Sequence, residues 1–119
     1  FLTMIQVKIK RSEGNITSFE ISGHANSGPY GFDLVCAAVS AVSFGSINAA
    51  LKLGTSDLTI VQGEDGGYLK VDIPSTLSNE RFEKVQLIFE AMIVSLETIE
   101  REYKQFIRIQ DHRGGADEC

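Results

Sequence analysis

The architecture of this chain is most constrained by residues 5–21, which read Ile5-Gln6-Val7-Lys8-Ile9-Lys10-Arg11-Ser12-Glu13-Gly14-Asn15-Ile16-Thr17-Ser18-Phe19-Glu20-Ile21. Apolar and polar side chains alternate along this stretch, which is the two-residue period of a half-buried strand. The Gly14-Asn15 pair interrupts the alternation and predicts a tight turn. We therefore predict a β-hairpin whose inward face carries Ile5, Val7, Ile9, Thr17, Phe19 and Ile21.

A loop and a long apolar helix follow the hairpin. Residues 25–32 include the Gly, Pro, Ser and Asn residues typical of loops. Asp33 stands directly before an apolar run and predicts an N-cap, because its carboxylate can accept the unpaired N–H groups of a first helical turn. The helix should run from Leu34 to about Leu53, with Gly54 as its stop. It is apolar around most of its circumference, so we expect it to be heavily buried.

The second half of the chain repeats the order of the first half, two strands followed by a helix. Residues 58–61 and 68–73 are strand candidates, and Glu64-Asp65-Gly66-Gly67 predicts a tight turn between them. Ser78 predicts the N-cap of a second helix, and residues 106–109 predict a final edge strand. That helix carries an apolar stripe at steps of three and four residues, formed by Phe82, Val85, Phe89, Met92, Leu96, Ile99 and Tyr103. We interpret the stripe as packing against the sheet, and a contact between two copies of the chain is the alternative.

The order β-β-α-β-β-α-β predicts an α+β domain, in which a mixed or antiparallel sheet is covered by two helices. We expect one domain over residues 1–111 and a flexible tail over 112–119. Met4 reads as a natural start, so residues 1–3 are either a cloning remnant or an upstream extension. We find no signal segment, and no apolar run that approaches the roughly 20 residues of a membrane span. These features predict a soluble, cytoplasmic protein without a membrane partner.

The charge balance bears on the class of partner. The net charge is −5, and the basic residues are scattered along the sequence. Direct binding of nucleic acid requires a concentrated basic face, so this class is disfavoured. A basic peptide or protein is a better partner for such a surface.

The two cysteines lie in different settings and need separate explanations. Cys36 is in the apolar helix, whereas Cys119 ends a polar tail, and we do not expect a disulfide in a cytoplasmic chain. A buried cysteine is usually only a small hydrophobic residue. If Asp33 is the N-cap, however, Cys36 is the third helical residue, where the helix dipole and unpaired N–H groups stabilise a thiolate. The same N–H groups could hold an oxyanion, so Cys36 is a candidate nucleophile.

Three polar residues could assist this thiol. His24 ends the first hairpin, and the loop returns the chain to the helix start, so its imidazole could reach the Cys36 thiol as a general base. A structural histidine is the alternative. Asp33 could cap the helix or orient His24, and we favour the cap, because a carboxylate beside a thiol opposes its ionisation. Ser40 lies one turn after Cys36 and could either bond within the site or bond back to the carbonyl of residue 36.

A metal or cofactor site has less support than a cysteine nucleophile. His24 and Cys36 supply two ligands of the three or four that a metal site needs, and His112 and Cys119 would have to fold back from the tail. The glycines of residues 25–32 are not followed by the Gly-Lys-Ser/Thr of a phosphate-binding loop. We therefore expect neither a metal nor a cofactor.

Several segments together resemble the ribosomal-processing cysteine protease Prp family of bacteria. They are Gly23-His24-Ala25, Gly28, Gly31, Asp33-Leu34-Val35-Cys36-Ala37-Ala38-Val39-Ser40, Gly63-Glu64-Asp65-Gly66-Gly67-Tyr68 and Met92-Ile93-Val94-Ser95-Leu96. The resemblance covers Met4 to about Ile109. It implies an endopeptidase that removes the N-terminal extension from the precursor of large-subunit ribosomal protein twenty-seven.

The resemblance also implies roles for individual residues. Cys36 and His24 match the family's catalytic dyad, and Asp33 and Ser40 match its supporting polar residues. The segment between His24 and Asp33 matches a mobile loop over the substrate cleft, and family members are usually homodimers. In this chain Gly28 and Gly31 could act as hinges of such a loop. Its aromatic residues, Tyr30 and Phe32, could contact an apolar substrate side chain or merely pin the loop to the core.

Two rival functions remain at this point. One is a Cys-His hydrolase that acts on small amides or thioesters. The other is a ribosome-associated binding module without enzymatic activity, in which His24 and Cys36 are structural. A general RNA-binding role is the least favoured, given the charge balance.

Overall fold

The structure is a computed structural model that covers residues 4–23, 30–64 and 66–112, with only the backbone of Tyr30. Its elements are β1 (Ile5–Ser12), β2 (Asn15–Ser22), α1 (Tyr30–Leu53), β3 (Thr59–Gln62), β4 (Tyr68–Asp72), α2 (Asn79–Glu102) and β5 (Ile107–Asp111). The strands form a five-stranded sheet in the order β3-β4-β2-β1-β5. β5 pairs with β1 in parallel and the other pairs are antiparallel, which confirms the predicted α+β fold with a mixed sheet.

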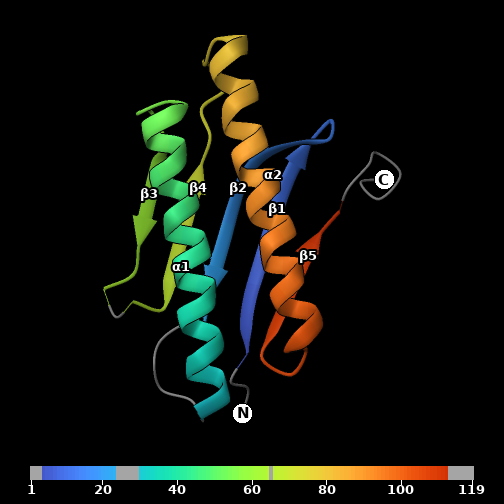
Figure 1. The fold of residues 1–119 in the computed structure, drawn as a ribbon. Helices are drawn as coiled ribbons and strands as arrows, with labels where there is room; N and C mark the ends of the chain where they lie inside the picture. Colours follow the sequence, from blue (N-terminus) through green and yellow to red (C-terminus); the bar gives the residue numbers. More distant parts are fainter. Residues whose placement is uncertain (1–3, 24–29, 65, 113–119) are drawn as a thin grey trace.

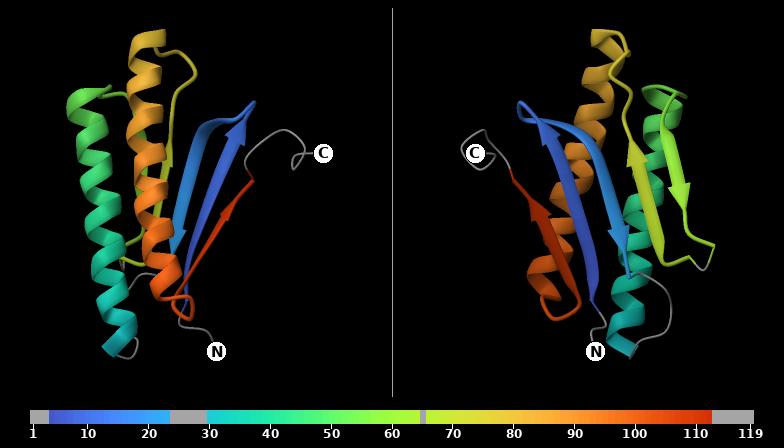
Figure 2. Two further views of the ribbon diagram at one scale, coloured as in Figure 1. Left: turned by 45° about the vertical axis from the view of Figure 1, so that its right-hand side comes forward. Right: turned by 180° about the vertical axis from the view of Figure 1, so that it is seen from behind.

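The two helices form a layer on one face of the sheet (Figures 1 and 2). They lie side by side along the strands, and no element among the described residues covers the opposite face. Between the layers lies the hydrophobic core, whose largest fully buried side chains include Phe19, Phe89, Ile5, Ile16, Ile21, Leu69, Met92, Ile93, Leu96 and Ile107. Alternation on the strands and periodicity on the helices therefore build one shared core.

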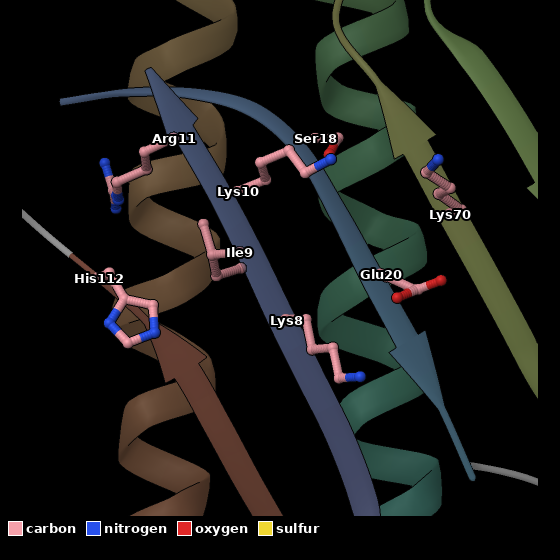
Figure 3. A pocket seen from close by; sticks show the side chains of 8 residues that line it. All are labelled: Lys8, Ile9, Lys10, Arg11, Ser18, Glu20, Lys70 and His112. Atoms are coloured by element: carbon pink, nitrogen blue, oxygen red, sulfur yellow. The ribbon is translucent and has the colours of Figure 1, made fainter. Parts of the chain in front are cut away.

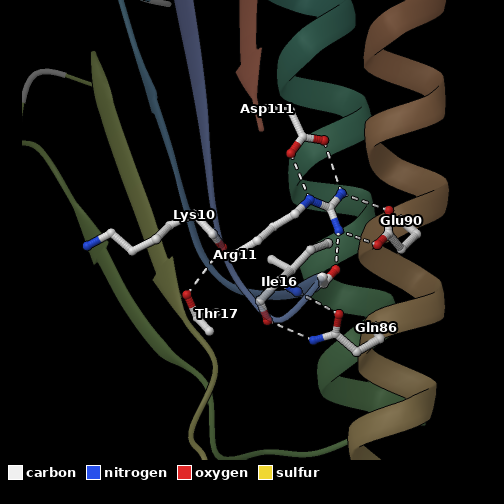
Figure 4. A network of polar contacts seen from close by, with 8 residues as sticks. Lys10, Arg11, Ile16, Thr17, Gln86, Glu90 and Asp111 are labelled. Carbon is white, nitrogen blue, oxygen red and sulfur yellow. Dashed lines mark hydrogen bonds and ion pairs between the residues drawn. The ribbon is translucent and has the colours of Figure 1, made fainter. Parts of the chain in front are cut away.

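A β-bulge changes the inward face of the first hairpin. The register between β1 and β2 shifts between Lys10 and Arg11, so Ile16 is buried and Thr17 is only partly buried. The expectation that Thr17 faces the core is therefore wrong. Gln86 of α2 holds the bulge: its Oε1 accepts a hydrogen bond from the Ile16 N–H at 2.8 Å, and its Nε2 donates to the Ile16 carbonyl at 2.7 Å (Figure 4). An extra residue in one strand inverts the alternation beyond it, which a simple two-residue pattern does not reveal.

Helix α1 begins earlier than its sequence predicts. Its first residue is Tyr30 rather than Leu34, so Gly31 and Phe32 belong to the helix and Asp33 lies inside the first turn. Asp33 is therefore not the N-cap of this helix. A tertiary contact explains the extension: the ring of Phe32 packs edge to face on Phe106, with 6.2 Å between centroids. Packing of this kind overrides weak local propensity. At the other end, α1 stops at Leu53 as predicted, and the Gly54 N–H donates to the Ala50 carbonyl at 2.9 Å.

Helix α1 is also longer and more apolar than expected. Residues Gly31–Leu53 have a mean hydropathy of 1.8 and are long and apolar enough, by length and composition, to cross a membrane. The expectation that no apolar run approaches this length is therefore wrong. In this fold the inner face of α1 is part of the core, through residues that include Phe32, Val35, Val39, Ile47 and Ala50.

Helix α2 follows its sequence pattern closely. Ser78 is the N-cap and its Oγ accepts a hydrogen bond from the Arg81 N–H at 3.3 Å. The middle of the predicted stripe is buried, at Val85, Phe89, Met92 and Leu96. This burial confirms the interpretation of the stripe as packing against the sheet.

Arg11 joins three elements through a buried ionic network (Figure 4). Its guanidinium donates to both carboxylate oxygens of Asp111 on β5, at 2.7 and 3.0 Å, and to both of Glu90 on α2, at 2.7 and 3.0 Å. It also donates to the Gly14 carbonyl at 2.7 Å, and its side chain is only 3% exposed. Two-point contacts of this kind fix geometry, so Arg11 fastens the edge strand β5 to the helix layer.

Candidate active site

The Cys36 thiol lies on the inner face of α1, near the start of the helix. Cys36 is 1% exposed and belongs to the hydrophobic core. Because α1 begins at Tyr30, Cys36 is its seventh residue and lies beyond the first turn. The N–H groups of the first turn, which would stabilise an anion, are therefore one turn away from the thiol.

The electrostatic surroundings of Cys36 favour the neutral thiol. Burial raises the pKa of the Cys36 thiol above its ordinary value, and the charge of Asp33 raises it further. Both effects disfavour a buried negative charge. The expectation that the helix start lowers the pKa of this thiol is wrong for this arrangement, and the cause is the extra turn of α1.

Asp33, Cys36 and Ser40 lie close to one line along α1. They are separated by three and four residues, the spacing that places side chains on one helical face. Oδ1 of Asp33 is buried and accepts no hydrogen bond from any residue that the structure describes. Ser40 is half-buried one turn after Cys36. The helix thus places the thiol on one face with two of the three polar residues that the sequence singled out, Asp33 and Ser40.

Gly23 is the last described residue before His24. His24 and Gly28 lie outside the described residues, but Gly23 ends the β2 region and has a φ of +82°. The Gly23 N–H donates to the Gly67 carbonyl at 3.0 Å. A Cβ at this position would lie 2.6 Å from the Met4 carbonyl oxygen, so a side chain does not fit. Sequence reasoning missed this role, although a glycine directly before the candidate base was the available signal.

Figure 1 shows that the end of β2 and the start of α1 lie at the same end of the molecule. The start of β1 and the turn before β5 lie there too. His24 directly follows the first of these segments and Cys36 lies shortly after the second. The described segments that flank residues 24–29 therefore lie at the same end of the molecule.

The two aromatic residues proposed for substrate contact, Tyr30 and Phe32, belong to α1 and not to a loop. Phe32 is 2% exposed and contacts Phe106, so the pinning interpretation holds for it. Phe106 also lies against Gly31, where an added Cβ would come within 3.0 Å of its ring. Tyr30 is the first residue of α1 rather than a loop residue. Sequence reasoning did not identify Phe106, because its partners are about 75 residues earlier in the chain.

A separate hollow of about 500 Å³ lies on the open face of the sheet (Figure 3). Its charged side chains alternate across the strands: Lys8 is opposite Glu20, which is opposite Lys70. Tyr68 donates a hydrogen bond to Glu20. Such cross-strand pairing is typical of a solvated sheet face. Cys36 does not line this hollow, so we do not assign the chemistry to it.

The described residues contain no cluster of three or more potential metal ligands among His, Cys, Asp and Glu. The chemistry that they do offer is that of a buried thiol in the second turn of α1, with a carboxylate and a hydroxyl on the same face. This is the arrangement of a nucleophile with polar support.

Comparisons with known proteins agree with this chemistry. The family model described as cysteine protease Prp matches residues 4–108. The ribosomal processing cysteine protease Prp of Bacillus subtilis is 50% identical over 107 residues, which cover 89% of this chain and 96% of that protein. The Staphylococcus aureus protein of the same name is 42% identical, covering 89% and 97%. A crystal structure of the S. aureus protease with a substrate peptide has a TM-score of 0.77 and 40% identity, covering 90% of this chain and 98% of that one.

Proposed function

The chain belongs to the Prp family of cysteine proteases, and from this membership we propose that it removes the N-terminal extension of the large-subunit ribosomal protein twenty-seven precursor. As in its relatives, the enzymatic class is cysteine protease, and the relatives are named for ribosomal processing. A related protease has been crystallised with a substrate peptide, which supports a polypeptide substrate. The net charge of −5 suits a basic ribosomal protein better than an acidic one. We place the reaction in the cytoplasm.

The proposed reaction uses Cys36 as nucleophile and His24 as general base and acid. The Cys36 thiol gives its proton to the His24 imidazole, and its sulfur attacks the scissile carbonyl carbon. The protonated imidazole then protonates the leaving amine as the C–N bond breaks, which leaves an acyl group on the sulfur. Water, activated by His24, hydrolyses this thioester and restores the thiol. The observation that carries the proposal is the placement of Cys36, Asp33 and Ser40 on one face at the start of α1.

A substrate panel tests the proposed specificity against a small-molecule hydrolase. The panel contains the precursor protein, the mature protein and small thioesters and amides. We expect cleavage of the precursor at one site, observed by intact-mass spectrometry, and no turnover of the small compounds. Efficient hydrolysis of the small compounds without precursor cleavage would contradict the proposal. Binding of the precursor without cleavage of any compound would favour the non-enzymatic module.

We further propose that the protease is a homodimer through the outer face of its helix layer. Between Asp33 and Lys52 the sequence of α1 contains no charged residue. Both helices expose large apolar side chains, including Leu34 on α1 and Leu87 and Val94 on α2. A groove of about 360 Å³ runs between the helices and is lined by Val42, Gly45, Ser46, Ala49, Ile88, Ala91, Met92 and Ser95. Small residues let another helix approach closely, and the uncharged stretch of α1 matches a second copy of itself.

Ala91→Glu tests this interface, because Ala91 is exposed and lines the groove. Two-fold symmetry would place a glutamate from each copy in the apolar contact, so we expect monomers by sedimentation at micromolar concentration. Val61→Glu is the matched control, because Val61 is an exposed apolar residue on β3, away from the helix layer. An Ala91→Glu variant that sediments like the control as a dimer would contradict this interface.

A further inference from the structure

The open face of the sheet gathers basic side chains that are far apart in the sequence. They are Lys8 and Lys10 on β1, Lys70 on β4 and Arg108 on β5, which we call the basic face. Each directly follows a buried core residue on its strand, so its side chain points away from the helices. No element among the described residues covers this face (Figure 2). The fold therefore concentrates charges that are scattered along the sequence.

Three of these four cations have no partner of opposite charge within the described part of the chain. They are Lys8, Lys10 and Arg108, whereas Lys70 forms one exposed ion pair at 3.8 Å. Three lysines line the hollow of about 500 Å³ on this face, and Glu20 is the one carboxylate among its described lining residues (Figure 3). The hollow therefore has an excess of positive charge, which an anionic partner would neutralise.

The helix layer has the opposite charge. Helix α2 contains six glutamates and three basic residues, which give it a formal charge of −3. On the open face, the four cations outnumber the two carboxylates, Glu20 and Asp72, which give that face a formal charge of +2. The molecule is therefore polarised across its two layers, although its net charge is −5. An anionic partner would be attracted to the sheet and repelled by α2.

The side chains around the basic face suit phosphate groups better than an acidic protein. The other residues that β1, β2 and β5 present on the open face, apart from Glu20, are Gln6, Ser18, Ser22 and Gln110, all of them polar. A stable interface between proteins has an apolar centre, which these strands do not offer on this side. Contacts to a phosphate backbone need charge and hydrogen-bond donors but no apolar centre. Because none of these side chains is aromatic, they can contact a backbone without stacking on bases.

We propose that the basic face binds the phosphate backbone of RNA, independently of base sequence. RNA is the polyanion that fits a family whose members are named for ribosomal processing, so the face would hold the protease against the RNA that surrounds a ribosomal protein. Cys36 does not line this face, so RNA bound there would leave the candidate active site free. The binding itself does not depend on the proposed peptidase function.

Fluorescence anisotropy tests the binding with two labelled single-stranded RNAs of unrelated sequence. We expect both RNAs to bind at low salt with similar Kd, because the contacts are to phosphates. The logarithm of the association constant should fall with the logarithm of the salt concentration with a slope of about −3, the value for four phosphate contacts on a single strand. Absence of binding at low salt, or a strong preference for one of the two sequences, would overturn the proposal.

A double substitution of the two β1 lysines locates the binding on the sheet. Lys8→Gln with Lys10→Gln removes two cations, so the Kd should weaken at least several-fold and the salt slope should fall to about −1.5. Lys8→Arg with Lys10→Arg keeps both cations and should retain binding. Lys52→Gln with Lys84→Gln is the matched control, because it removes the same charge from exposed lysines of α1 and α2. Equal weakening in the control would overturn the assignment to this face.

Two further measurements separate RNA from the other partners of a basic surface. Polyglutamate competes for the same cations if the partner is an acidic protein, and tighter binding of polyglutamate than of either RNA would overturn the proposal. Cleavage of the free precursor should be the same in the wild type and in the Lys8→Gln, Lys10→Gln variant, because Cys36 lies apart from the basic face. A parallel loss of cleavage would assign the face to the protein substrate and overturn the proposal. Failure of the wild type to cleave would contradict the proposed function and leave the RNA measurement unaffected.

Discussion

At the residue scale, Cys36 in this structure is a resting thiol rather than a preformed thiolate. It is buried in the core, and its neighbour Asp33 adds a negative charge to the surroundings. A low-pKa catalytic cysteine usually lies in an electropositive, accessible position. A base must therefore take the thiol proton before the sulfur can attack.

The pH dependence of alkylation tests this description of the substrate-free protein. Because the pKa of the Cys36 thiol is raised from the ordinary 9.0, its thiolate fraction at neutral pH is below that of an exposed cysteine. Alkylation by iodoacetamide should be slow at neutral pH and should rise continuously through about pH 9, without an earlier plateau. Asp33→Asn removes the second cause of the shift, so its curve should move to lower pH. A plateau near neutral pH in the wild type would contradict the resting arrangement.

At the scale of elements, Gly23 connects the sheet to the candidate base. Its φ of +82° and the close Met4 carbonyl leave no room for a side chain. The end of β2 and the start of β1 therefore approach each other only because residue 23 is glycine. This contact fixes the backbone at the end of β2.

Gly23→Ala should lower both stability and activity. The left-handed backbone alone costs about 1–2 kcal/mol for alanine, and the 2.6 Å contact with the Met4 oxygen adds a displacement of the strand end. Gly14→Ala is the matched control, since Gly14 has a φ of +83° but no atom within 4 Å of an added Cβ. We expect Gly23→Ala to lose more unfolding free energy in urea than Gly14→Ala, and only Gly23→Ala to lose precursor cleavage. Equal effects of the two substitutions would show that the close approach has no role.

The Arg11 network makes a second prediction at this scale. Arg11→Met removes the partner of a buried carboxylate, because Asp111 is only 6% exposed. Removing one partner of a buried ion pair costs about 3–5 kcal/mol. Lys84→Met is the control, since Lys84 forms an exposed pair with Glu80 at 3.3 Å, and such a pair contributes about 0.3–0.5 kcal/mol. Urea denaturation should separate the two variants clearly, and a loss below about 1 kcal/mol in Arg11→Met would contradict a structural role for the network.

Sequence patterns predicted some of these elements correctly and others wrongly. The α2 cap and stripe depend on local spacing, and both were predicted correctly. The inward face of β2 and the start of α1 were predicted wrongly, because each depends on a distant partner: Gln86 at the bulge and Phe106 at the helix start. At the candidate site, the position of Cys36 on a buried helix was predictable, whereas its place beyond the first turn of that helix was not.

At the scale of the whole molecule, three regions can be distinguished: the open face of the sheet, the outer face of the helix layer, and the end that carries the candidate active site. The sheet's open face carries cross-strand charge pairs, and the outer helix face is uncharged along α1. The candidate active site lies at the end where β2 finishes and α1 begins (Figure 1). A dimer through the helix layer would leave this end and the open face accessible to a substrate protein.

The most direct test of the central claim is cleavage of the precursor of ribosomal protein twenty-seven by the wild type and by Cys36→Ala, followed by intact-mass spectrometry. Cys36→Ala removes the sulfur, so it should abolish cleavage and leave precursor binding intact. We predict removal of the N-terminal extension by the wild type and no detectable product with the variant. Equal cleavage by both proteins would exclude Cys36 as the nucleophile and contradict the mechanism.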